Sequence, residues 1–436
     1  MEYVSSRPYG PLVGEVSVPG DKSLSHRCVL FAAMAEGTSH LRNVLNSEDV
    51  HSTIEAVRAL GSTVEEDLRA DGALDLTVTG WGERGPRTPS GPIDCGNSGT
   101  TARLLLGVLA GWDIRVTLTG DESLSRRPMD RVTGPLALMG ASFESASGTL
   151  PVTVHGGTLS RIEYDTPVAS AQVKTAVLLA GLRAPGRTLV REPAASRDHT
   201  ERLLPAFGID VGRESAAREA WVEGPAVPHS ADVRVPGDPS SAAFMVAAGL
   251  LVPGSRLTVR DVGLNPTRIA FLDVLERMGA DIAISPEPDA GAEPVGSIHV
   301  AHTPELTATV VRHEQVPALV DEIPVLALVA TLAHGTTRFE GVGELRVKES
   351  DRLTAVIEAL TALGGSARAE GDDLLVTGPG VLGGGVLDSR ADHRLAMVWA
   401  LAGLAASAPV TVTGFEAVNV SYPGFAADLA GLSAPS

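Results

Sequence analysis

The segment Thr101–Gly111 reads TARLLLGVLAG, an Ala- and Leu-rich run that ends at a glycine. Its apolar residues would fall on every side of a helix, which predicts a helix buried all round rather than an amphipathic one. Runs of this kind occur six times, at Arg27–Gly37, Thr101–Gly111, Gln172–Gly186, Ser241–Gly254, Pro324–Gly335 and Arg394–Ser407. Because their end points follow one another at a nearly constant spacing, the chain consists of six copies of one unit.

A second helix is predicted in each copy, amphipathic and closed in most copies by an apolar residue and a glycine. These helices are Ile54–Gly61, Val132–Gly140, Thr200–Gly208, Ile269–Gly279, Leu353–Gly364 and a shortened Phe425–Leu432. A glycine after the last apolar position is typical of a helix C-cap, and the β-branched runs that follow indicate strands. Strand and helix therefore alternate twice in each unit, and the fold class is α/β.

A repeated motif divides these copies into two halves. Val18–Ser23 reads VPGDKS, and Val235–Ser240 reads VPGDPS half a chain further on, each just before a buried helix. Because three units follow each motif, we expect one lobe at 21–236 and a second at 237–436 that residues 1–20 complete, with two strands crossing between the lobes. Pro-Gly at both crossings suits a hinge and is equally an ordinary turn.

The overall charge restricts the partners. A formal net charge of -18 argues against nucleic acid and anionic membranes, since phosphate polyanions would be repelled over most of the surface. Two cysteines outside any metal-ligand spacing, and no signal peptide at the start, fit a reducing cytoplasm. Leu395–Phe415 is uncharged throughout and has the length of a membrane span, but Pro409 and its glycines predict a helix followed by a strand.

Lysine is rare in this chain. It occurs only at Lys22, Lys174 and Lys348, while arginine supplies the other 32 of 35 basic residues. A chain that uses Arg for general positive charge can keep Lys where a compact ammonium is required, although a compositional bias would also leave a few lysines at random. Lys22 and Lys348 lie in runs that look like sites. Lys174 is either a solvated helix residue or the lip of a site.

Each buried helix opens with polar residues. In chain order these are Lys22-Ser23-Arg27, Asn97-Ser98-Gly99-Thr100, Ser170-Ala171-Gln172, Asp238-Ser240-Ser241, Asp321-Glu322 and Asp392-His393-Arg394. Helix capping explains the residues Asp238, Ser240, Ser241 and Asp392. Capping does not explain Lys22, Arg27 and Arg394, because a cation at the positive end of a helix dipole is unfavourable. An anionic ligand would offset these charges.

We therefore expect the six helix starts to face a common cleft that binds anions. Arg127, before Pro128, adds a further cation, as do Lys348 and Arg352. Lys348 and Arg352 are four residues apart and share one helix face if the helix begins by Glu349. Five or six charge-assisted bonds, each of roughly 1.5 to 3 kcal/mol, would hold a substrate with several phosphate or carboxylate groups.

Two carboxylates do not fit a simple anion binder. Asp321 and Glu349 would repel an anionic ligand by around 4 kcal/mol per unit charge at close contact near a surface. An enzyme that moves protons on and off such a ligand needs them as general base and acid. The alternative is that Glu349 pairs with Arg352 and that Asp321 caps a helix.

Taken together, these residues resemble the enolpyruvyl transferase family, and most closely its 5-enolpyruvylshikimate-3-phosphate synthases. The resemblance covers Val18–Pro423. Its most specific motifs are Asp21–Arg27, Gly96–Arg103, Arg127–Met129, Ser170–Gln172, Leu345–Arg352 and Asp392–Arg394. It implies two lobes, each of three βαβαββ-type repeats with buried parallel helices, in a pseudo-six-fold, inside-out α/β barrel that closes on its substrates.

The resemblance also implies a reaction and its residues. The 5-hydroxyl of shikimate 3-phosphate would attack C2 of phosphoenolpyruvate while C3 is protonated, and phosphate would then leave, in a cytoplasmic monomer without metal or organic cofactor. Phosphoenolpyruvate would be held by Lys22, Arg127, Lys348, Arg352 and Arg394, and the shikimate phosphate by Ser23, Arg27, Ser170, Gln172 and Asp321. Further binding positions are Asn97, Ala171, Arg197 and His393. Asp321 would be the base, and Glu349 with Lys22 would move the proton at C3. Gly99 would line the phosphoenolpyruvate pocket, where the inhibitor glyphosate competes.

Three positions depart from many relatives. Val420 stands where they have a lysine, Glu344 where some have Asn, and Ala171 where others have Ser. One phosphoenolpyruvate contact and the sensitivity to glyphosate therefore stay open.

Two other functions are open. The sister reaction on UDP-N-acetylglucosamine would require a cysteine five residues before Arg127, where this chain has Glu122. A non-catalytic anion sensor or a paralogue of secondary metabolism would share the binding residues. An assay of phosphate release separates these possibilities.

Overall fold

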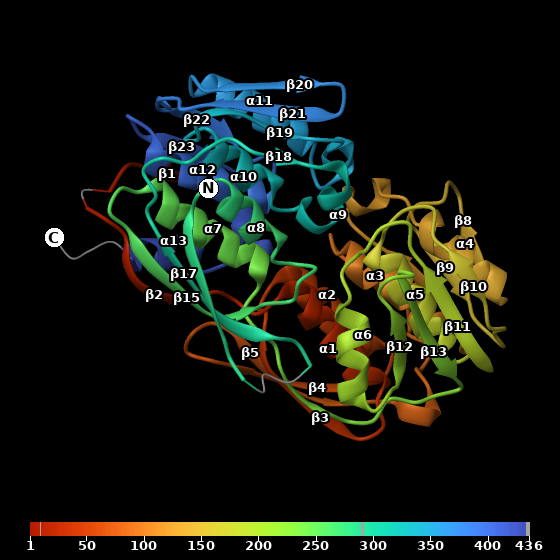
Figure 1. Cartoon of the computed structure of the whole chain (residues 1–436). Helices are drawn as coiled ribbons and strands as arrows, with labels where there is room; N and C mark the ends of the chain where they lie inside the picture. Colours follow the sequence, from red (N-terminus) through yellow and green to blue (C-terminus); the bar gives the residue numbers. More distant parts are fainter. Residues whose placement is uncertain (9, 289–291, 433–436) are drawn as a thin grey trace. The chain divides into compact units, whose positions relative to one another are not determined.

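The computed structural model describes residues 1–8, 10–288 and 292–432 (Figure 1). The chain forms two compact units: Gly20–Val235, here called the inserted unit, and Met1–Pro19 with Pro236–Ser436, here called the split unit. The chain thus passes from one unit to the other after Pro19 and returns at Pro236. These junctions lie one residue before the boundaries expected from the repeated VPGD motif.

Three repeats of strand, helix, strand, helix, strand, strand build the inserted unit. The first contains α1 (Lys22–Met34), β3 (Thr38–Val44), α2 (Glu48–Ala59), β4 (Thr63–Leu68) and β5 (Leu74–Thr79), and takes its missing strand from β14 (Asp232–Arg234). The second contains β6 (Ile93–Asp94), α3 (Gly99–Ala110), β7 (Arg115–Thr119), α4 (Asp130–Met139), β8 (Ser142–Ser145) and β9 (Val152–His155). The third contains β10 (Glu163–Asp165), α5 (Ala171–Gly181), β11 (Gly186–Arg191), α6 (His199–Leu203), β12 (Val211–Glu214) and β13 (Glu219–Gly224).

The split unit repeats the same pattern. Its first repeat contains β2 (Val13–Ser17), α7 (Pro239–Leu251), β15 (Arg256–Gly263), α8 (Ala270–Arg277), β16 (Asp281–Pro286) and β17 (Val295–Ala301). The next contains β18 (Val310–Val311), the short α9 (Val316–Leu319), α10 (Ile323–Ala330), β19 (Gly335–Phe339), α11 (Arg352–Ala362), β20 (Ser366–Glu370) and β21 (Asp373–Gly378). The last contains β22 (Gly385–Asp388), α12 (His393–Ala405), β23 (Val410–Thr413) and α13 (Phe425–Gly431), with β1 (Glu2–Ser5).

Five of the six sheets in the described residues share one four-stranded topology, and the sixth, β22-β23-β1, lacks the fourth strand. In the order β6-β7-β9-β8, the first two strands are parallel and the others pair antiparallel, and four further four-stranded sheets have the same arrangement. Strands from distant parts of the chain complete three of the sheets: β14 lies parallel to β3, β2 parallel to β15, and β1 antiparallel to β23. The α/β class and the repeated βαβαββ pattern predicted from the sequence are therefore confirmed.

The Ala- and Leu-rich helices form the core, as their patterns predict. All 13 residues of α7 are buried, and it packs on α10 and α12. Figure 1 shows the sheets of the split unit lying around these helices. The uncharged stretch Leu395–Phe415 forms most of α12 and then β23, confirming the predicted helix followed by a strand. No helix in the described part of the chain has the length and apolar character needed to cross a membrane.

The two VPGD motifs have equivalent surroundings. A Cβ atom on Gly20 would lie 2.0 Å from the carbonyl oxygen of Asn43, and one on Gly237 would lie 3.0 Å from that of Asp261. Asn43 and Asp261 both have positive φ, at irregularities in β3 and β15. Each motif thus requires a glycine because a strand backbone approaches it closely. The Asp residues of both motifs, Asp21 and Asp238, cap the helices that follow.

Candidate active site

Hydrogen bonds join the buried helix starts of the inserted unit. Arg27 of α1 donates from Nη2 to Thr175 Oγ1 of α5 at 3.0 Å, and Gln172 at the start of α5 donates from Nε2 to Thr100 Oγ1 of α3 at 3.0 Å. The first turns of α1, α3 and α5 therefore lie together. Ser98 and Ser170 cap α3 and α5 with their side chains, so the local sequence sets where each helix begins.

Asn97, Gly99 and Arg127 form one cluster. Arg127 donates from Nη2 to Asn97 Oδ1 at 2.8 Å, and Asn97 donates in turn to Asp121 Oδ2 at 2.6 Å. A Cβ atom on Gly99 would lie 3.6 Å from Arg127 Nη1 and 2.8 Å from Arg103 Nη1. The absence of a side chain at Gly99 thus lets the Arg103 guanidinium approach the backbone closely, with Arg127 nearby. Two guanidinium groups at one helix start offer charge-assisted hydrogen bonds to an anion.

Arg103 links this cluster to the start of α5. It donates from Nη1 to Gln172 Oε1 at 2.8 Å and from Nη2 to the carbonyl oxygen of Pro128 at 3.2 Å. Sequence reasoning placed Arg103 inside a motif but gave it no role. A signal was present, because a cation four residues after Gly99 interrupts an otherwise apolar helix.

The cations of α1 are offset by groups of the protein itself. Lys22 Nζ lies 2.5 Å from Asp49 Oδ2 at the start of α2. Arg27 is buried and donates to Thr200 Oγ1 at 2.9 Å and to the carbonyl oxygen of Ser23 at 3.0 Å. Sequence reasoning missed Asp49, whose pairing with Lys22 has no local spacing signal.

Arg352 is the centre of a second cluster, in the split unit. Its side chain is 1% exposed and contacts three carboxylates: Asp392 at 2.8 Å, Asp321 at 3.2 Å and Glu349 at 2.6 Å. Burial works against the charged form of Arg352, but attraction to these carboxylates outweighs it and raises the pKa of the guanidinium. Burial likewise opposes ionisation of Asp392, yet Arg352 and His393 hold its pKa below the usual value.

Arg394 joins the starts of α10 and α12. Its guanidinium lies 3.7 Å from Asp321 Oδ2 and 3.5 Å from Glu322 Oε1. Glu322 is buried and accepts a 2.5 Å hydrogen bond from Ser240 of α7, so the three buried helices of this unit also begin together. The six helix starts thus gather in two groups of three. Their convergence on one common cleft stays a prediction.

The condition under which Lys348 and Arg352 would share a helix face is not met. The structure begins α11 at Arg352, because Asp351 caps it, and Lys348 precedes the helix with extended backbone. Lys348 and Arg352 therefore share no helix face. Lys348 instead pairs with Glu344 at 3.0 Å. Glu349 pairs with Arg352 at 2.6 Å, which is the arrangement given above as the alternative to a proton-transfer role.

Capping explains only part of the polar helix starts. Asp238 and Asp392 accept hydrogen bonds from backbone amides of α7 and α12, as predicted. Ser240 and Ser241 do not cap, because they lie inside α7. Asp321 does not cap α10 either, since Glu322 occupies the N-cap position without a side-chain bond.

The remaining predicted residues lie at or near the same helix starts. Ala171 and His393 are the first residues of α5 and α12, and Arg197 lies half-buried between β11 and α6. Lys174 is neither solvated nor at a lip. It is 4% exposed and forms ion pairs with two buried glutamates.

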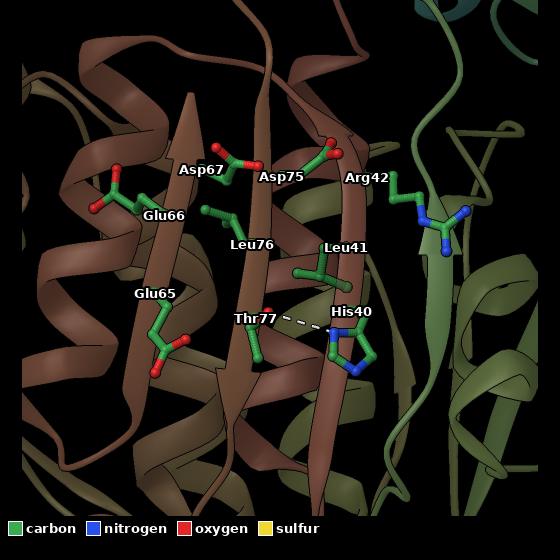
Figure 2. A pocket seen from close by; sticks show the side chains of 9 residues that line it. All are labelled: His40, Leu41, Arg42, Glu65, Glu66, Asp67, Asp75, Leu76 and Thr77. Atoms are coloured by element: carbon green, nitrogen blue, oxygen red, sulfur yellow. Dashed lines mark hydrogen bonds between the residues drawn. The ribbon is translucent and has the colours of Figure 1, made fainter. Parts of the chain in front are cut away.

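A hollow of about 330 Å³ lies on the exposed face of the sheet β14-β3-β5-β4 (Figure 2). Figure 2 shows its side chains standing on β3, β4 and β5, with helices behind the sheet. Its ionisable lining residues are His40, Arg42, Glu65, Glu66, Asp67 and Asp75. Four carboxylates would repel a phosphate, and no predicted site residue lines this hollow.

Two further chemistries find no support among the described residues. They contain no group of three or more His, Cys, Asp or Glu side chains arranged to hold a metal ion. Burial raises the pKa of the Cys95 thiol to about 12, so it is protonated at neutral pH and is a poor nucleophile.

The profile of the family described as EPSP synthase (3-phosphoshikimate 1-carboxyvinyltransferase) matches residues 6–429. The chain belongs to this family. A relative from Halorhodospira halophila named 3-phosphoshikimate 1-carboxyvinyltransferase is 48% identical over 420 residues, covering 96% of this chain and 93% of its own length. The resemblance drawn from six short motifs is therefore confirmed.

Solved structures of EPSP synthases and related transferases have the same fold. An EPSP synthase from Acinetobacter baumannii is 40% identical with a TM-score of 0.88, covering 99% of this chain and 98% of its own. The enolpyruvyl transferase NikO from Streptomyces tendae covers 100% of this chain and 98% of its own with a TM-score of 0.80. At 20% identity, the likeness to NikO concerns the fold alone.

Proposed function

We propose that this chain transfers the enolpyruvyl group of phosphoenolpyruvate to the 5-hydroxyl of shikimate 3-phosphate and releases phosphate. The observation that carries the proposal is the match to the EPSP synthase family over residues 6–429. Both substrates are anions, and the two clusters of Lys and Arg side chains offer the charge-assisted bonds that such ligands need despite the net charge of -18.

The reaction adds an alcohol across a double bond and then eliminates phosphate. The hydroxyl oxygen bonds to C2 of phosphoenolpyruvate, C3 gains a proton, and the hydroxyl proton passes to a base. The tetrahedral adduct then loses a proton from C3 while the bond from C2 to the phosphate oxygen breaks. Two proton-transfer groups are therefore sufficient, and each contributes typically 10²- to 10⁴-fold to the rate.

Asp321 and Glu349 are the proposed proton-transfer groups, together with Lys22. Both carboxylates contact Arg352, and both remain partly exposed, at 16% and 32%. Asp321 would accept the hydroxyl proton as the general base. Glu349 would exchange the proton at C3.

Binding roles follow from the positions of the cations. Phosphoenolpyruvate would be bound by Lys22, Arg127, Lys348, Arg352 and Arg394, with glyphosate competing beside Gly99. The acceptor shikimate 3-phosphate would be bound by Ser23, Arg27, Ser170, Gln172 and Asp321, with Asp321 at its hydroxyl. Arg27 and Arg352 are both buried and already held by protein groups, which preorganises their charges.

We also place the enzyme in the cytoplasm as a monomer. Two cysteines in the whole sequence cannot build a disulfide framework, which fits a reducing compartment. Size-exclusion chromatography with light scattering measures the oligomeric state directly.

The deciding experiment measures phosphate release with each acceptor in turn. We expect release from phosphoenolpyruvate with shikimate 3-phosphate and none with UDP-N-acetylglucosamine. Binding of both substrates without release would indicate an anion sensor and overturn the proposal. Release only with the nucleotide sugar would assign the sister reaction instead.

A further inference from the structure

Lys174 is buried between two carboxylates in the inserted unit. Its ammonium lies 2.7 Å from Glu192 Oε2 and 2.7 Å from Glu201 Oε1. The side chains of all three are no more than 5% exposed. Lys174 belongs to α5, Glu192 follows β11, and Glu201 belongs to α6. One cation thus ties three successive segments of the third repeat together.

Stability alone is a weak reason for such a cluster. Burying charges removes them from water, and a well-packed apolar group of similar size often stabilises a fold as much or more. One ammonium facing two carboxylates is also not balanced in charge. The groups that each glutamate adjoins suggest a different role.

Glu192 connects Lys174 to the start of α5. While its Oε2 atom pairs with Lys174, its Oε1 atom accepts a hydrogen bond from the backbone amide of Ser170 at 3.2 Å. Ser170 in turn caps α5 by accepting from the amide of Val173. The position of Ser170, a proposed ligand of the acceptor phosphate, thus depends on the carboxylate that Lys174 holds.

Glu201 connects Lys174 to Arg27. The neighbours of Lys174 and Glu201 in sequence are Thr175 and Thr200, whose hydroxyl groups lie 2.7 Å apart. Arg27 donates to both hydroxyls, from Nε to Thr200 at 2.9 Å and from Nη2 to Thr175 at 3.0 Å. The ion pair between α5 and α6 therefore lies beside the hydrogen bonds that orient the guanidinium of Arg27.

We propose that Lys174 is a positioning residue for the phosphate group of the acceptor. Through Glu192 it fixes Ser170, and through Glu201 it fixes the two threonines that orient Arg27. The inference rests on the proposed function, which makes Ser170 and Arg27 ligands of that phosphate. It assigns Lys174 no contact with substrate.

The test compares three ligands in Lys174→Met by calorimetry. We expect the affinity for shikimate 3-phosphate to fall by about 10- to 100-fold, as when a binding group is displaced by a fraction of an ångström to an ångström. Affinity for shikimate, which lacks the phosphate, and for phosphoenolpyruvate should change less than threefold, a threshold set by ordinary scatter between variants.

Leu189→Ala is the matched control. Leu189 is a buried residue of β11, three positions before Glu192, so its truncation destabilises the same segment without touching the ion pairs. At a similar loss of melting temperature, this variant should keep the affinity for shikimate 3-phosphate. An equal loss in both variants would reduce Lys174 to a structural residue.

A second variant covers the case that Lys174→Met does not fold. Glu192→Ala removes the acceptor of the Ser170 amide but leaves Lys174 paired with Glu201, so no buried charge is left unbalanced. It should show the same selective loss for shikimate 3-phosphate. Equal changes in the affinities for all three ligands, or no change in any of them, would overturn the proposal.

The parent protein is assayed first, so that a failure of the proposed function can be distinguished from a failure of the role proposed for Lys174. A parent that releases no phosphate overturns the proposed function. An active parent whose variants lose no phosphate-specific affinity overturns only the role of Lys174.

Discussion

Arg352 and Asp392 form a two-bond ion pair in which both side chains are almost fully buried. Nε donates to Oδ2 at 2.8 Å and Nη2 donates to Oδ1 at 3.2 Å. The same carboxylate caps α12 by accepting from the amide of Arg394 at 3.0 Å. One pair thus sets the starts of α11 and α12 and the position of the Arg394 side chain. Arg352 is both a proposed ligand and a structural element.

Replacing Arg352 should therefore destabilise the split unit. Arg352→Met would leave Asp392 buried without its counter-ion, which typically costs about 3 to 5 kcal/mol. Urea unfolding followed by circular dichroism measures this loss. Arg368→Met is the control, because the pair of Arg368 with Glu370 is exposed and should contribute less than about 1 kcal/mol. Similar losses in the two variants would contradict the assignment.

Glu349→Gln should leave both substrates bound but slow turnover. Glutamine keeps the size of the side chain and can still accept from Arg352, yet it cannot exchange the proton at C3, so we expect kcat to fall by around 10²-fold or more. Steady-state kinetics measures kcat and both KM values. In Glu344→Gln, which alters a neighbouring carboxylate paired with Lys348, kcat should stay within a few-fold. Unchanged turnover in Glu349→Gln would remove Glu349 from the mechanism.

Gly99→Ala should weaken binding of phosphoenolpyruvate. The new Cβ atom would lie 2.8 Å from Arg103 Nη1, so this guanidinium must move, and 3.6 Å from Arg127 Nη1. We expect the KM for phosphoenolpyruvate to rise roughly tenfold, equivalent to about 1.4 kcal/mol. In Gly134→Ala no atom lies within 4 Å of the new Cβ, so KM should not change. A normal KM in Gly99→Ala would place phosphoenolpyruvate elsewhere.

His26 should make the stability depend on pH. It is fully buried on α1, and burial lowers its pKa from 6.5 to about 3, against a smaller opposing effect of Asp49. Between these values the unfolded chain binds a proton that the folded chain does not. The contribution of His26 to the free energy of unfolding is therefore complete above about pH 6.5. It falls by about 1.4 kcal/mol per pH unit as the pH drops towards 3.

Denaturation at pH 7, 6 and 5 tests this dependence before most carboxylates titrate. In His26→Asn, which can keep the contact of the His26 Nδ1 atom with Thr53, the free energy of unfolding should be nearly constant over this range. His40→Asn, on the exposed side of β3, should keep the slope of the parent. If the free energy of unfolding of His26→Asn depends on pH as steeply as that of the parent, another titratable group causes the dependence.

The repeats could be predicted because each one has a local signal. Apolar runs such as Thr101–Gly111 predict buried helices on their own, and six similar runs predict six similar units. The strands that complete three sheets have no comparable signal. Val233 pairs with Leu41 from the far end of the inserted unit, and Val4 pairs with Thr411 from nearly the other end of the chain. Nothing in either segment specifies its partner.

The residues of the candidate site also divide into those with a local sequence signal and those without one. Its cations could be named because Lys22, Arg27 and Arg394 stand at helix starts, where an isolated cation is unfavourable. Their protein partners could not be named, since Asp49 and Glu322 meet them only through the packing of separate helices. The environment of Lys174 was missed for this reason, as its two glutamates belong to later segments that only tertiary packing brings to α5.

The pairing of β2 with β15 bears on how the polypeptide matures during translation. Residues Gly20–Val235 can leave the ribosome and fold as a unit before β2 has a partner. The residues with which β2 pairs, Arg256–Arg260, are synthesised later. The strand β1 can pair only after Val410–Thr413 has been synthesised, which is later still. The strands β1 and β2 thus precede the inserted unit in the chain but can pair only after it has been synthesised, and this delay makes them a natural site for chaperone binding.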